Sequence, residues 1–105
     1  MIPSQAKTLS RPLRRSDLTV HELDGEALVF DAASGDTHRL NGTALFIWRE
    51  CDGRHDVRQV AERMAKTYDV SLDSAVEHVE RMFNQFDDLH LFVDSTEPMQ
   101  KSWDT

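Results

Sequence analysis

Residues 18–40 read LTVHELDGEALVFDAASGDTHRL, and this stretch decides the fold. Within it, runs rich in residues that favour β-strands lie at 18–23, 27–32 and 37–40. The pair Asp24 and Gly25 is a two-residue hairpin signal, and Gly35 lies in a second turn after Ser34. The stretch therefore predicts a three-stranded antiparallel meander, which is too thin to be stable unless helices cover one of its faces.

Three helical segments are predicted after the meander, and each begins at a residue whose side chain can cap a helix. These residues are Asn41, Asp56 and Ser71. The third segment has the clearest periodicity, with apolar residues at i, i+3, i+4 and i+7. Its apolar positions are Leu72, Ala75, Val76, Val79, Met82, Phe83, Phe86 and Leu89. The predicted fold class is therefore α+β and winged-helix-like, with a three-stranded antiparallel sheet followed by three helices.

The predicted domain spans residues 17–93 and is flanked by two polar segments. Residues 1–16 are predicted to be a flexible basic arm, because they contain two prolines, four basic residues, no acid and no apolar periodicity. Residues 94–105 are predicted to be a flexible tail, and no role is assigned to Trp103 within it.

The charge of the chain argues against a nucleic-acid partner. Residues 17–105 contain eight basic and 19 acidic residues, which gives this part of the chain a net charge of −11. The third helical segment, residues 72–90, contains five acidic residues and a single basic one, Arg81. Since the phosphates of DNA and RNA are negative, such a surface would repel them. A winged-helix DNA-binding regulator therefore remains only as an alternative.

The sequence also argues against a membrane protein and a secreted protein. The chain contains no run of about 18 apolar residues, so no membrane partner is expected. Its N-terminus has basic residues but no apolar segment, and it therefore lacks a secretory signal. Cys51 is the only cysteine, and a lone cysteine without such a signal favours a cytoplasmic location.

No pattern of catalytic or metal-binding residues is found. The five histidines show no metal-ligand spacing, and no glycine-rich phosphate loop or nucleophile elbow is present. Cys51 and Trp48 fall on the apolar face of the first helical segment, so both are expected in the core, with Phe30 of the central strand nearby. No enzyme activity, cofactor or metal is therefore expected. A thiol enzyme stays open only if Cys51 is exposed beside a histidine.

Residues 40–53, LNGTALFIWRECDG, resemble the PqqD family, with its Leu-Asn start, aliphatic helix and closing Asp-Gly. Residues 57–64 and 68–70, followed by an acidic amphipathic helix, resemble the next parts of the same pattern. The resemblance covers residues 18–93 and implies the fold of a RiPP recognition element. It implies a non-catalytic peptide chaperone that binds a ribosomally made precursor (leader) peptide and presents it to a modifying enzyme, often a radical SAM enzyme.

The resemblance also implies where the peptide binds. In the family the peptide adds as a strand to the edge of the third strand and lies against the third helix. The strand positions are Thr37, His38, Arg39 and Leu40, and the helix positions are Val76, Val79, Phe83 and Phe86. Strand addition fits a short edge strand, which offers unpaired backbone groups. A PqqD-like adaptor in another pathway remains a further alternative.

Overall fold

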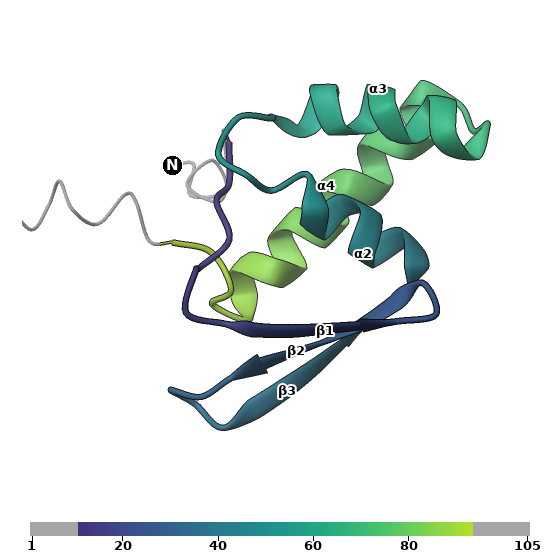
Figure 1. Ribbon diagram of the computed structural model, residues 1–105. Helices are drawn as coiled ribbons and strands as arrows, with labels where there is room; N and C mark the ends of the chain where they lie inside the picture. Colours follow the sequence, from purple (N-terminus) through teal and green to yellow (C-terminus); the bar gives the residue numbers. More distant parts are fainter. Residues whose placement is uncertain (1–10, 94–105) are drawn as a thin grey trace, which may run out of the picture.

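The computed structural model describes residues 11–93, which Figure 1 shows in colour. The strands are β1 (Thr19–Leu23), β2 (Glu26–Asp31) and β3 (Asp36–Leu40), and the helices are α2 (Gly42–Arg49), α3 (Val57–Tyr68) and α4 (Leu72–Asp88). The predicted α+β fold, with a three-stranded antiparallel sheet followed by three helices, is confirmed. Residues 1–10 and 94–105 lie outside the described residues, and so do most of the predicted arm, the predicted tail and Trp103.

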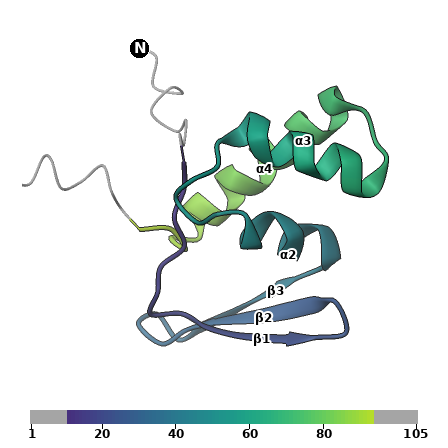
Figure 2. The same ribbon diagram turned by 45° about the horizontal axis from the view of Figure 1, so that its top comes forward.

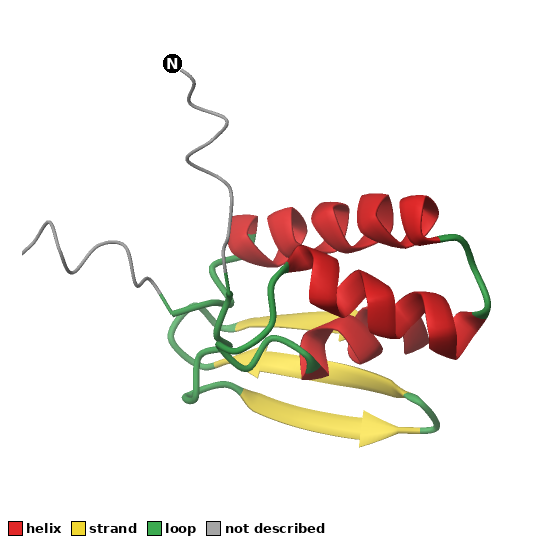
Figure 3. Cartoon of the chain, turned by 90° about the horizontal axis from the view of Figure 1, so that it is seen from above, coloured by secondary structure: helices red, strands yellow, loops and turns green. Residues whose placement is uncertain are grey.

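The sheet is antiparallel, with β2 between β1 and β3, so that β3 forms one edge. Asp24 and Gly25 connect β1 to β2 with φ angles of 54° and 80°. Two successive left-handed residues form the hairpin turn that the sequence predicted. The helices lie on one side of the sheet in Figures 1 and 2, and in Figure 3, seen from above, the strands lie beneath them.

Each of the three helices begins at the predicted N-cap. The Asn41 side chain accepts a hydrogen bond from the Ala44 amide, and the Ser71 side chain accepts one from the Ser74 amide. Asp56 and Gln59 form a capping box, in which each side chain accepts a hydrogen bond from the backbone N–H of the other residue. These local contacts fix where the helices start, and therefore which residues face the sheet.

Alternate residues of β2 point toward the helices, and Ala27, Val29 and Asp31 are the buried ones. Phe30 points to the opposite face and is 40% exposed, so the prediction that it packs near Trp48 is wrong. Residues 27–30 are apolar without interruption, and such a run does not determine which face of the strand is buried. Trp48 instead makes an edge-to-face contact with Phe86, with 5.3 Å between the ring centroids.

Cys51 is fully buried, as core packing requires, and its thiol donates a hydrogen bond to the Ile47 carbonyl. Burial raises the pKa of the Cys51 thiol well above its ordinary value. A nucleophilic cysteine needs an accessible thiolate, so this geometry argues against the thiol-enzyme alternative.

Residues 12–15, here called the N-terminal segment, pack against the domain, whereas the sequence placed them in a flexible arm. The Arg14 amide donates to the Cys51 carbonyl at 3.0 Å, and the Val93 amide donates to the Leu13 carbonyl at 2.8 Å. The Arg14 guanidinium also donates hydrogen bonds to the carbonyls of Trp48 and Arg49 at the C-terminal end of α2. A cation at this end of a helix interacts favourably with the helix dipole. The folded body therefore begins before the boundary expected at residue 17.

Candidate functional site

A groove lies between β3, the start of α2 and the C-terminal half of α4. It contains a cavity of about 180 Å³. The residues around this cavity are His38, Arg39, Leu40, Asn41, Thr43, Ala44, Met82, Gln85, Phe86 and Leu89. Small-molecule pockets usually measure roughly 300–1,000 Å³, so this volume suits one or two side chains rather than a whole organic ligand.

Strand β3 supplies one wall of the groove. In the register with β2, His38 is opposite Val29 and Leu40 is opposite Ala27, so both lie on the face that the helices cover. Thr37 and Arg39 therefore lie on the outer face, and both are exposed. Among the described residues no further strand pairs with the free edge of β3. This edge therefore presents backbone groups to any extended chain that lies beside it.

Helix α4 and its C-cap Leu89 supply the opposite wall, where the spacing of three and four residues places Met82, Gln85 and Leu89 in one stripe. Phe86 lies beneath them and is 1% exposed. The stripe is apolar at Met82 and Leu89, and Gln85 is an exposed polar position between them. An apolar side chain entering the groove would therefore be covered by Met82 and Leu89 and would rest on Phe86.

The structure separates the helix positions that the resemblance implied. Of the four, only Phe86 lines the groove. Val79 and Phe83 are buried in the core, and Val76 is partly buried against it. The groove stripe lies at one margin of the broad apolar face, whereas the implied positions follow its centre. Met82 and Leu89 belonged to the predicted apolar series, but the sequence alone did not distinguish them from the positions that pack into the core.

A larger hollow of about 560 Å³ lies on the outer face of the sheet, around Leu23, Leu28 and Arg39. Size alone favours this hollow, but its floor is the face of the sheet and no helix lies on that side (Figure 1). A peptide lying there would have the sheet as its floor but no helix as a second wall. In the groove, the free edge of β3 faces α4, and we therefore take the groove as the candidate site.

Charge around α4 favours a basic partner. Asp73, Glu77 and Glu80 are exposed on this helix, and Arg81 is its one basic residue.

No group of three or more potential metal ligands occurs within residues 11–93. The same residues contain no helix long and apolar enough to cross a membrane.

Comparison with known proteins gives one family and two related structures. A family model described as coenzyme PQQ synthesis protein D (PqqD) matches residues 26–91, which is more than half of the chain. No curated protein matches the chain. A structure named "Lasso peptide synthetase B1 complexed with the leader peptide" is 20% identical with a TM-score of 0.71, and the match covers 80% of this chain and 99% of that one. A structure named "TbiB1 in Complex with the TbiA(beta) Leader Peptide" is 11% identical with a TM-score of 0.70, and the match covers 78% and 95%. At these identities the two structures show that the fold is shared.

Proposed function

Because the chain belongs to the PqqD family, we propose that it is a non-catalytic domain that binds a ribosomally made precursor peptide for a modifying enzyme. The observation that carries the proposal is the groove, with the free edge of β3 as one wall and the apolar stripe of α4 as the other. The two solved structures of the same fold are named as complexes with leader peptides, which supports the proposal.

The proposed mode of binding is strand addition at residues 37–40. Backbone hydrogen bonds to β3 would supply affinity for any extended peptide, and alternate side chains would supply specificity. Side chains that point inward would enter the cavity beside His38 and Leu89, and those that point outward would lie near Thr37 and Arg39. The apolar part of the cavity lining, at Leu40, Met82 and Phe86, favours one large apolar residue in the peptide. The net charge of −7 on the chain favours a lysine or arginine elsewhere in the peptide.

The direct contacts on α4 are proposed to come from Met82, Gln85 and Leu89, with Phe86 as the floor. Val76, Val79 and Phe83 then act behind the groove, because they pack into the core that holds α4 in place. The recipient of the peptide is proposed to be a modifying enzyme of the radical SAM type, or another enzyme that acts on such peptides. The proposed location is the cytoplasm, where a single unpaired cysteine is common.

The DNA-binding alternative is not favoured by the structure. A winged-helix regulator needs a basic helix to enter a groove of DNA. Helix α4 instead exposes Asp73, Glu77 and Glu80.

The test uses peptides selected for binding to the full chain from a displayed library of random peptides. On titration, nuclear magnetic resonance shifts are expected at residues 36–40 and 82–89. Leu89→Ser should weaken the selected peptide by about two- to five-fold, since a peptide can cover at most the 36% of Leu89 that is exposed, roughly a third of the 1.5–3 kcal/mol for burying a whole leucine.

Val70→Ser is the matched control, because Val70 is 42% exposed and Leu89 is 36% exposed. Val70 lies in the connection between α3 and α4, away from the groove residues, and its variant should bind as the unmodified chain does. Shifts confined to α3, or to the outer face around Leu23 and Leu28, would show that the groove is not the site.

A further inference from the structure

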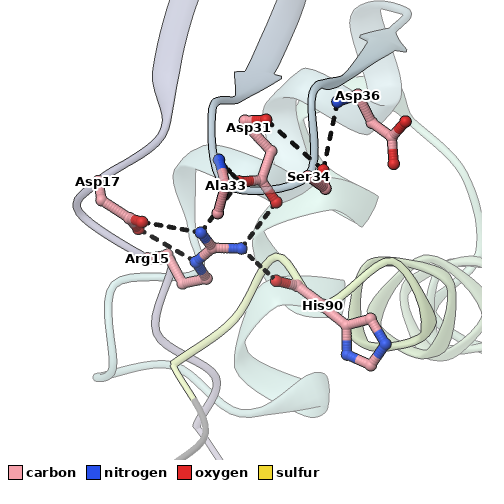
Figure 4. A network of polar contacts seen from close by, with 7 residues as sticks. All are labelled: Arg15, Asp17, Asp31, Ala33, Ser34, Asp36 and His90. Atoms are coloured by element: carbon pink, nitrogen blue, oxygen red, sulfur yellow. Dashed lines mark hydrogen bonds and ion pairs between the residues drawn. The ribbon is translucent and has the colours of Figure 1, made fainter.

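Arg15 connects the two sides of the groove at the end where α4 finishes. Its Nη1 donates to Asp31 Oδ2 at 2.9 Å, and its Nη2 donates to Asp31 Oδ1 at 3.1 Å. The same Nη1 donates to the His90 carbonyl at 2.9 Å. Figure 4 shows these contacts converging on a single guanidinium group. Asp31 is paired with Asp36, the first residue of β3, and His90 directly follows Leu89 of the groove.

On the sheet side, the contact reaches β3 through the turn that precedes it. Asp31 is 4% exposed, and besides Arg15 it accepts a hydrogen bond from the Ala33 amide at 3.0 Å. The Asp31 carbonyl accepts from the Gly35 amide at 2.7 Å, which closes the same turn. Because these bonds fix the turn, holding Asp31 also fixes the point at which β3 begins.

On the helix side, the contact holds a residue in an uncommon backbone conformation. His90 has a φ of 60°, in the left-handed region that residues other than glycine seldom adopt. Its amide donates to the Asp87 carbonyl at 2.9 Å, and its carbonyl accepts from Arg15. Such a conformation persists where surrounding contacts hold it in place, and Arg15 supplies one of those contacts.

We propose that Arg15 is a positioning residue for peptide binding, which sets the separation of β3 and α4 without touching the peptide. The inference rests on the proposed function, since the width of the groove matters only if a peptide binds in it. Arg15 belongs to the N-terminal segment and is no part of the cavity lining. The groove would thus depend on a part of the chain that lies outside the family match at residues 26–91.

The guanidinium is suited to this task by its shape. Its five N–H donors are all used: two on Asp17, two on Asp31 and one on the His90 carbonyl. A planar fork fixes both the distance and the angle between its acceptors, which the single ammonium group of lysine does not. Without the Arg15 contacts, β3 and α4 would be less ordered at this end of the groove, and the peptide would have to order them as it binds. That ordering costs free energy and lowers the affinity.

Asp17 provides a matched control for Asp31. Both carboxylates receive two hydrogen bonds from Arg15, but the Asp17 side chain is 63% exposed and the Asp31 side chain is 6% exposed. Asp17 precedes β1 and lies outside the groove lining. Asp17→Asn therefore weakens one partner of Arg15 but leaves its contacts with Asp31 and the His90 carbonyl, which join the β3 and α4 sides of the groove, in place.

The experiment is amide hydrogen exchange of the full chain under native conditions, comparing Arg15→Lys, Asp31→Asn and Asp17→Asn. Arg15→Lys and Asp31→Asn should each speed exchange at residues 36–40 and 89–91 by about ten-fold. In the unmodified chain, local opening of these residues must break the hydrogen bonds of Arg15, and in the variants those bonds are weakened or lost. Amides of α3 should change much less. Asp17→Asn should change the groove amides by less than about three-fold. Uniform acceleration across the domain would show that Arg15 only supports global stability, and would overturn the proposal.

Peptide affinity supplies the second readout. A library peptide selected on the unmodified chain should bind Arg15→Lys about five- to ten-fold more weakly, and should bind Asp17→Asn with an affinity within about two-fold. Unchanged affinity for Arg15→Lys, combined with peptide shifts in the groove, would overturn the positioning role and leave the proposed function intact. Peptide shifts outside the groove would instead show that the groove is not the binding site, and a library that yields no binding peptide would overturn the proposed function. In both cases the exchange data would still report whether Arg15 connects the walls of the groove.

Discussion

The N-terminal segment and the groove differ in how completely their polar groups are used. In the segment, Arg15 uses all its donors and Arg14 donates to two carbonyls at the end of α2. In the groove, β3 has a free edge, and a cavity with a mixed polar and apolar lining lies between the strand and α4. Buried polar groups are almost always paired in a folded protein, so the paired region supports the structure. A region with open backbone groups beside a cavity is instead suited to a ligand.

The largest expected effect comes from Trp48, which contacts both regions. Its ring lies 6.0 Å from the Arg14 guanidinium carbon and makes an edge-to-face contact with Phe86 beneath the groove. Trp48→Ala should lower the free energy of unfolding by about 3–5 kcal/mol, the usual cost of emptying a large core site. Chemical denaturation measures the change. Tyr68→Ala removes a 40% exposed aromatic and should cost much less, so equal losses would show that Trp48 is peripheral.

A smaller loss is expected where the N-terminal segment meets the turn after α2. Gly53 has a φ of 83°, and its amide donates to the Pro12 carbonyl at 3.0 Å. Gly53→Ala places a Cβ in the left-handed region and should cost about 1–2 kcal/mol. Gly42→Ala is the control, because Gly42 is the first residue of α2 and has no positive φ. It should be neutral or should stabilise by up to about 1 kcal/mol. Thermal unfolding of both variants distinguishes these outcomes by sign.

Acid should weaken the contacts that Arg15 makes with Asp31 and Asp17. The hydrogen bonds from Arg15 lower the pKa of Asp31 and of Asp17 below their ordinary values. A carboxylate whose folded pKa is lowered stabilises the protein above its unfolded pKa, near 3.9. That stabilisation is lost as pH falls through the folded value. Unfolding should therefore become easier below about pH 4, and Asp31→Asn should flatten this dependence. If the free energy of unfolding of Asp31→Asn falls with pH as steeply as that of the unmodified chain, the acid-induced loss of stability comes from other carboxylates.

The two regions also differ in what the sequence could predict. The three strands, the turn at Asp24 and all three N-caps were predicted, because each depends on residues adjacent in the chain. The N-terminal segment was missed, since it joins the domain through single long-range bridges, from Leu13 to Asp52 and from Arg14 to Phe92. Such bridges leave no periodic pattern in the sequence. Basic residues at 14 and 15 instead resembled a solvated charged arm.

Within the groove, the sequence predicted the elements but not the side of α4 that lines it. Helical periodicity identified an apolar face, and its centre, at Val79 and Phe83, packs into the core. Which margin of that face remains open depends on where β3 and α2 lie, and that is a tertiary property. Met82 and Leu89 could be named as apolar positions from the sequence, but only the fold separates them from the core positions.

The smallest expected change in stability distinguishes the groove from the outer face of the sheet. Leu89 in the groove and Leu28 on the outer face are 36% and 48% exposed, so replacing either with serine removes part of a half-buried side chain. Each variant should lower the free energy of unfolding by a similar amount, about 1 kcal/mol. Their effects on peptide binding should nevertheless differ. Leu89→Ser should weaken a library-selected peptide by calorimetry, because Leu89 covers the cavity beside the free edge of β3. Leu28→Ser should leave the affinity unchanged, because Leu28 lies on the outer face of the sheet, where no helix forms a second wall beside a strand edge. The opposite result would place the peptide on the larger, outer hollow. It would also show that apolar area, rather than a strand edge that faces a helix, decides where this domain binds a peptide.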